Sequence, residues 1–154
     1  MLEYIQATST KEYEIAAMLF KEYATAINID LQFQRFDEEL SALQDMYRMP
    51  QGGIILCALN KEWIGCVAMR KIDSHIAELK RMYVKPQYQQ QGIGKELLKK
   101  AIVLAKKCGY NKIRLDTLKH MLPAIGLYKK AGFYEIPPYY FNPITSAVFF
   151  ETVL

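Results

Sequence analysis

A glycine-rich segment, Gln89-Gln90-Gln91-Gly92-Ile93-Gly94-Lys95, lies where a predicted strand ends and a long predicted helix begins. Two glycines this close together let the backbone approach a ligand, and the first N–H groups of a helix have no acceptor within it. The positive end of the helix dipole favours an anion at the same place. The segment therefore predicts a pyrophosphate site; a glycine-containing turn without a ligand is the alternative.

Two familiar phosphate-binding patterns do not fit this segment. The Rossmann fingerprint needs a third glycine three residues after the second, where this chain has Leu97. A P-loop is excluded because the chain contains no GxxxxGK followed by Ser or Thr. The predicted ligand is therefore a phosphate compound held by another kind of fold.

The elements that must position this turn follow from the spacing of apolar residues, which recur every three to four residues in helices and alternate in strands. Helices are predicted at 10–27, 36–47, 92–108 and 122–131, and strands at 2–7, 53–59, 62–72, 75–84, 112–118, 133–136 and 145–153. The strand–helix–strand step from 78 to 117 implies one parallel pair inside a largely antiparallel sheet. We predict a mixed α/β fold with a six- to seven-stranded sheet and flanking helices.

Composition and charge exclude several classes of protein. With 154 residues, 51% of them hydrophobic and 23% charged, the chain is typical of one globular domain. Its net charge of +4 falls short of the dense basic stripe of a nucleic-acid-binding protein. The longest apolar run, Ile54–Leu59, is too short to cross a bilayer, and residues 1–6 lack a signal-peptide core. We expect a cytoplasmic protein with neither a nucleic-acid nor a membrane partner.

The cysteines and histidines do not form a metal-binding pattern. Cys57, Cys66 and Cys108 are odd in number and contain no CxxC pair, and only His75 and His120 accompany them. Each cysteine has apolar neighbours in the sequence, which predicts buried, reduced thiols and no bound metal.

The glycine turn and a later segment of the sequence resemble the signatures of a known family. The Gln89-x-x-Gly92-x-Gly94 pattern fits the Arg/Gln-x-x-Gly-x-Gly/Ala signature of the GNAT superfamily of N-acetyltransferases. The preceding Leu79-x-x-Met82-Tyr83-Val84 looks like the family's strand before the turn. The segment Ala124-Ile125-x-Leu127-Tyr128-x-x-x-Gly132-Phe133 is similar to the second signature. Both signatures are in order and at the expected distance, so we expect one GNAT-like domain over residues 1–154.

The resemblance implies an acetyl-CoA-dependent N-acetyltransferase with the acyl-CoA N-acyltransferase fold. Such an enzyme moves an acetyl group to a primary amine of a small molecule or peptide by direct attack, through a tetrahedral intermediate and without a metal. In this fold the central parallel strands splay apart and the pantetheine arm lies between them. The implied cofactor-binding residues are Met82, Tyr83, Val84, Gln89, Gln90, Gln91, Gly92, Ile93, Gly94 and Lys95. Lys99 or Lys100 would lie near the 3′-phosphate, unless these lysines only form a solvated helix face.

The resemblance also implies catalytic roles. Tyr128 would protonate the leaving thiolate, and the backbone N–H of Val84 would stabilise the oxyanion. The general base would be Glu78, with Asp116 as the other carboxylate able to reach the cleft. Because residues alternate along a strand, Glu78 should share a face with Met82 and Val84.

One departure from the family pattern affects the cofactor site. The family often has Asn where this chain has Met121, and His120 or Thr117 are the neighbouring polar substitutes. This difference keeps open a second function, a non-catalytic acyl-CoA-binding sensor or regulatory module. Residues 28–40 and 137–144 are expected to select the acceptor amine, and the family's habit of dimerising makes a homodimer one expected assembly.

Overall fold

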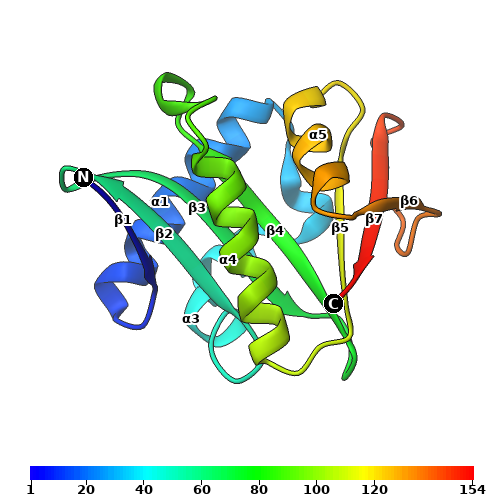
Figure 1. Ribbon diagram of the computed structural model, residues 1–154, viewed down its shortest axis with the longest axis horizontal. Coiled ribbons are helices and arrows are strands. Elements are labelled where there is room, and N and C mark those ends of the chain that lie inside the picture. Colours follow the sequence, from blue (N-terminus) through cyan, green and yellow to red (C-terminus); the bar gives the residue numbers. More distant parts are fainter.

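A seven-stranded sheet runs through the computed structural model, which describes residues 1–154 (Figure 1). In chain order the strands are β1 (Leu2–Gln6), β2 (Gly53–Leu59), β3 (Glu62–Lys71), β4 (Ile76–Val84), β5 (Lys112–Leu118), β6 (Tyr134–Ile136) and β7 (Ala147–Val153). They are arranged in the order β1-β2-β3-β4-β5-β7-β6, and only the β4–β5 pair is parallel. The predicted mixed, mainly antiparallel sheet is confirmed.

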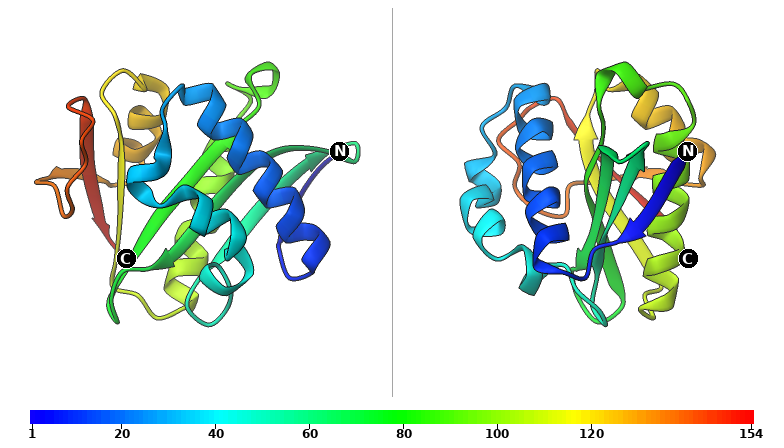
Figure 2. Two further views of the ribbon diagram at one scale, coloured as in Figure 1. Left: turned by 180° about the vertical axis from the view of Figure 1, so that it is seen from behind. Right: turned by 90° about the vertical axis from the view of Figure 1, so that its left-hand side faces the viewer.

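Helices cover both faces of this sheet (Figure 2). They are α1 (Thr10–Ile27), α2 (Phe36–Ser41), α3 (Leu43–Met46), α4 (Ile93–Lys107) and α5 (Leu122–Lys130). The first three lie on one face, which we call the α1 face, and the last two lie on the other, the α4 face. Because both faces are covered, the interior strand β2 is apolar throughout: Ile54 and Leu56 pack on the α1 face, and Ile55 and Cys57 on the α4 face.

None of the helices combines the length and the apolar character needed to cross a lipid bilayer. The thiols of Cys57 and Cys66 are buried as predicted, whereas Cys108 is only partly buried.

The prediction of one helix over 36–47 is wrong, because the chain there forms α2 and α3 with a break at Ala42. The backbone of Ala42 has φ −125° and ψ 20°, which is not helical. Just before the break, the Ser41 hydroxyl donates to the carbonyls of Asp37 and Glu38. Such side-chain bonds to the preceding turn compete with the backbone ladder and weaken the helix there. The break lets Leu43 and Tyr47 turn into the core.

A β-bulge in β4 changes which side chains share a face. Lys80 pairs with Ala68 and Tyr83 with Cys66, so Arg81 and Met82 together oppose a single residue of β3. Arg81 takes up the extra length in a left-handed conformation, with φ +57°. Side-chain alternation is therefore shifted by one residue beyond the bulge.

Because of the bulge, Glu78 lies on the opposite face of the sheet from Met82 and Val84. Before the bulge, Ala77 and Leu79 face α4, so Glu78 faces α1 with its cross-strand neighbour Arg70. After the bulge, Met82 and Val84 pack on the α4 face. The expectation that Glu78 shares a face with Met82 and Val84 is wrong.

The parallel strands β4 and β5 separate partway along their length. They pair only from Ile76 with Lys112 to Glu78 with Arg114, although β4 continues to Val84 and β5 to Leu118. The predicted splayed central pair is confirmed, and the gap opens a path through the sheet.

Candidate active site

A cavity of ≈520 Å³ occupies the gap between β4 and β5 and is lined from both faces of the sheet. The predicted residues that line it are Met82, Tyr83, Val84, Gln89, Gln90, Gly92, Gly94, Lys95, Asp116 and Tyr128. Five others lie outside the lining: Gln91 is exposed, Ile93 and Glu78 are buried, and Lys99 and Lys100 lie further along α4, near Tyr4. The structure thus brings most of the predicted site into one cavity.

The glycine turn has the geometry of an anion cradle. Gly92 adopts φ +84°, and a Cβ placed there would meet no atom within 4 Å. The first bond of α4 runs from the Glu96 N–H to the Gly92 carbonyl, and no side chain caps the helix. The N–H groups of Gly94 and Lys95 therefore have no acceptor in the chain and are available to oxygen atoms of a ligand.

The N–H of Val84 is free on the side of the gap, whereas the Val84 carbonyl accepts a hydrogen bond from Gln89 Nε2 at 2.9 Å. The N–H of Lys85 donates to the Ile64 carbonyl, which makes Lys85 and Ile64 a hydrogen-bonded pair of the β3–β4 ladder. Such pairs alternate in an antiparallel ladder, so Val84, opposite Gly65, directs its own N–H and carbonyl away from β3. Because β5 has already separated, that N–H can meet a ligand.

Tyr128 joins the cavity from α5 and is 5% exposed. Its ring packs against Phe133 and Phe150, which fix its position. Burial raises the pKa of the Tyr128 phenol well above its ordinary value, and the nearby Tyr23 and Asp116 raise it further. The hydroxyl is therefore a protonated group throughout the physiological range.

The two candidate bases differ in their surroundings. Both oxygens of Glu78 are held by other residues: Arg70 Nε donates to Oε1 at 3.0 Å, and the Tyr139 hydroxyl donates to Oε2 at 2.6 Å. Asp116 lines the cavity and accepts both of its hydrogen bonds at Oδ2, from Tyr140 and Asn142. Its Oδ1 is thus the carboxylate oxygen that a ligand can reach.

The 137–144 loop forms the wall that was expected over the pocket. The rings of Tyr139 and Tyr140 pack on Phe149 with centroids 5.2 and 5.4 Å away, and their hydroxyls bind Glu78 and Asp116. Burial, followed by the adjacent carboxylate, raises the pKa of both phenols. They remain hydrogen-bond donors that hold the carboxylates in place.

Sequence reasoning did not single out three other residues of the lining, Tyr23, Gln34 and Lys80. Gln34 belongs to the short 3₁₀ helix η1 (Leu31–Gln34), and its Nε2 donates to the Tyr140 hydroxyl. Its Oε1 is buried and has no partner in the chain. No motif marks these positions; only the range 28–40 pointed to Gln34.

Of the two polar residues that could replace the missing Asn, Thr117 lines the cavity and His120 does not. Met121 and Thr117 both line it, and the Thr117 hydroxyl contacts the Met121 sulfur at 3.5 Å. His120 is exposed and outside the lining. Thr117 is therefore the neighbouring polar group within reach of a bound molecule.

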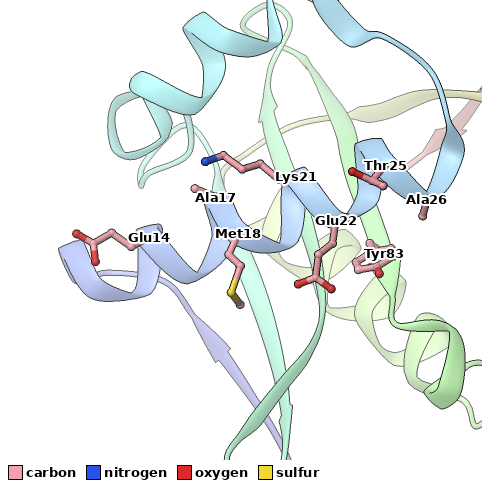
Figure 3. Close-up of a pocket in the computed structure, with 8 residues that line it drawn as sticks. All are labelled: Glu14, Ala17, Met18, Lys21, Glu22, Thr25, Ala26 and Tyr83. Carbon is pink, nitrogen blue, oxygen red and sulfur yellow. The ribbon is translucent and has the colours of Figure 1, made fainter.

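A second hollow, of ≈760 Å³, lies along the outer side of α1 (Figure 3). All of its lining side chains except Tyr83 come from that one helix. Tyr83 and Ala26 line both this hollow and the central cavity. The hollow contains none of the other predicted site residues, although it is the larger in volume.

Comparison with known proteins identifies the family. The model of the acetyltransferase (GNAT) family matches residues 16–133. The chain belongs to this family. An uncharacterized N-acetyltransferase of Schizosaccharomyces pombe is 39% identical over 135 residues, covering 86% of this chain and 82% of the relative. This chain is accordingly an acyltransferase.

Solved structures share the fold of this GNAT domain. A crystal structure of an acetyltransferase from Streptococcus agalactiae has a TM-score of 0.81 at 19% identity, covering 99% of this chain and 98% of that one. A GNAT family acetyltransferase from Elizabethkingia anophelis with acetyl-CoA bound has a TM-score of 0.70 at 23% identity and covers 99% of this chain and 98% of its own.

Proposed function

We propose that this GNAT protein transfers the acetyl group of acetyl-CoA to a primary amine of a small molecule or peptide. The observation that carries the proposal is the single cavity that joins the glycine turn, the free Val84 N–H and the Tyr128 hydroxyl. The acetyl-CoA bound in the related structure from Elizabethkingia anophelis supports the same co-substrate here.

The residues of the cavity fit acetyl-CoA, which supplies an activated acetyl thioester when bound. The free N–H groups of Gly94 and Lys95 suit the pyrophosphate, and the Lys95 side chain on the same lining adds positive charge. Met82 and Val84 face α4, on the same side of the sheet as the turn, which suits the pantetheine arm.

Two groups of the chain can move protons at the site. A primary ammonium must lose a proton before it becomes a nucleophile, and Asp116 Oδ1 can accept it. The Tyr128 hydroxyl can donate a proton to the departing sulfur, because burial keeps it protonated. The Val84 N–H can donate a hydrogen bond where negative charge develops.

Acetyl-CoA titration by calorimetry tests the proposal, and Gly92→Glu is its sharpest variant. We expect the wild type to bind and Gly92→Glu to lose at least about tenfold in affinity, since the new side chain places negative charge beside the pyrophosphate. Gly109→Glu is the matched control, because Gly109 has φ +89° and equally open surroundings at the other end of α4. An equal loss in both variants would assign the effect to backbone strain. A wild type that does not bind acetyl-CoA refutes the proposal.

The base assignment is tested by comparing Asp116→Asn with Glu78→Gln. We expect Asp116→Asn to lower kcat/KM by about 10²-fold, because the oxygen that faces the cavity no longer accepts a proton. Glu78→Gln should lose less than about tenfold, since its oxygens are occupied by Arg70 and Tyr139. Thiol release with a panel of primary amines measures both. The reverse order would return the role of base to Glu78.

A further inference from the structure

Two opposite charges, Lys80 and Asp116, line the same cavity without pairing with each other. Lys80 and Asp116 each lie two residues beyond Glu78 and Arg114, the last pair of the β4–β5 ladder. Lys80 is opposite Ala68 on the α1 face, and Asp116 is on the same face because Leu115 before it packs toward α4. Both line the cavity where the strands begin to part.

Lys80 is a nearly buried cation with an incomplete set of partners. Its side chain is 9% exposed, and its one ion-pair contact is Glu78 Oε1 at 3.9 Å, too far for a hydrogen bond. The same Glu78 oxygen already accepts a hydrogen bond from Arg70, and Glu39 is taken by Arg81. Three cations therefore share two carboxylates, and the Lys80 ammonium is the unmatched one. Burial lowers its pKa, which an anionic ligand would reverse.

Asp116 is a carboxylate without a cationic partner. The donors to its Oδ2, Tyr140 and Asn142, are neutral, so no cation of the chain balances the carboxylate. Gln34, held by Tyr140, adds a buried Oε1 that has no donor. An ammonium group provides three N–H donors and a positive charge, which suit these two acceptors.

We propose that the acceptor is a small zwitterionic amine, an amino-acid-like molecule whose ammonium group binds Asp116 and Gln34 while its carboxylate binds Lys80. This inference rests on the proposed function, which requires an amine in the same cavity. It makes Lys80 a specificity-determining residue. A simple alkylamine would leave the Lys80 cation unmatched, and a simple carboxylate would leave Asp116 unmatched.

Calorimetry with matched probes tests the inference in the presence of saturating coenzyme A. The probes are ω-amino acids of about two to six carbons, each compared with the alkylamine and the alkanoate of the same length. We expect the best ω-amino acid to bind at least about tenfold more tightly than either partner compound, because only it satisfies both charges. An alkylamine or alkanoate that binds as tightly overturns the proposal, whatever the variants do.

Variants assign the preference to its residues. Lys80→Met keeps the length of the side chain and should remove the preference for the ω-amino acid over the alkylamine, with coenzyme A affinity unchanged. Lys71→Met, an exposed lysine of β3 outside the cavity, should retain the preference. A preference that survives Lys80→Met contradicts the assignment. If coenzyme A does not bind, the proposed function is refuted, and the panel is repeated on the free protein. A zwitterion preference there would support a zwitterion-binding site at Lys80 and Asp116 without an acceptor role, and its absence would refute the site as well.

Discussion

Replacing Tyr128 with Phe is expected to lower kcat by about 10²-fold or more, with the affinity for acetyl-CoA changed by less than about twofold. General acids typically contribute factors of this size, and the Tyr128 phenol is a protonated group that lines the cavity beside the proposed cofactor residues. The ring remains in Tyr128→Phe, so its packing on Phe133 and Phe150 is kept. Single-turnover thiol release and calorimetry separate the two effects.

Tyr134→Phe is the control for this prediction. Tyr134 is 46% exposed on β6 and its hydroxyl donates to Glu151, away from the cavity. Its loss should leave kcat within about twofold of the wild type. If kcat also stays within about twofold in Tyr128→Phe, Tyr128 is not the acid.

The pH dependence gives a second readout for Tyr128. A tyrosine phenol ordinarily titrates at 10.0, and burial raises the pKa of Tyr128 above that value. The protonated, donating form therefore persists through pH 10, and kcat should show no falling limb at about pH 10 that depends on this residue. A limb there that disappears in Tyr128→Phe would mean that the phenol titrates normally.

The sequence was sufficient for the features that depend on local chemistry. The glycine turn is visible because Gly92 and Gly94 sit at a helix start, and Tyr128 because it belongs to a contiguous signature. The splayed strand pair followed from the same signatures, since the fold that they imply contains it. The glycine turn is specified over a short stretch of chain, where spacing constrains the backbone, whereas the role of Tyr128 and the splayed strands were implied by the family resemblance.

The face of Glu78 was not predictable from the same information. Period-two alternation holds only in a regular strand, and the bulge at Arg81 interrupts it. Arg is not a residue that signals a positive φ, so nothing in the sequence marks the bulge. Arg81 is held instead by Glu39, 42 residues earlier in the chain, and this contact exists only after α2 has packed on the sheet.

The roles of the 137–144 loop were predicted only in outline. Its proline and aromatic content indicated a wall over a pocket, and the structure places Asn142 and Ile144 in the lining. The Tyr139 hydroxyl donates to Glu78, which is 61 residues away in the sequence. The Tyr140 hydroxyl donates to Asp116, which is 24 residues away. Those contacts leave Asp116, and not Glu78, with an oxygen toward the cavity.

Replacing Glu39 with Ala is expected to destabilise the protein by about 3–5 kcal/mol, because it leaves the Arg81 guanidinium buried and unpaired. Glu39 accepts hydrogen bonds from Arg81 Nε at 3.1 Å and Arg81 Nη2 at 2.7 Å, and from the Tyr47 hydroxyl at 3.0 Å. Both charged side chains are almost completely buried. Urea unfolding followed by circular dichroism measures the change in the free energy of unfolding.

Glu38→Ala is the matched control, one residue away on α2. Glu38 pairs with Arg35 at the surface, where its side chain is 65% exposed, so the loss should be within about 0.5 kcal/mol. A cost below about 1 kcal/mol for Glu39→Ala would contradict a stabilising role for the buried pair.

The pH dependence of the same comparison separates charge pairing from packing. Burial opposes ionisation of Glu39, but the hydrogen bonds and charge of Arg81 outweigh it and lower the pKa of the carboxyl. A lowered folded-state pKa means that the stabilisation is present above the ordinary value of 4.5 and is lost as the pH falls through the folded-state pKa. The difference between wild type and Glu39→Ala should therefore shrink below pH 4.5. A difference that is constant with pH would assign the effect to packing alone and leave the bulge at Arg81 without its electrostatic support.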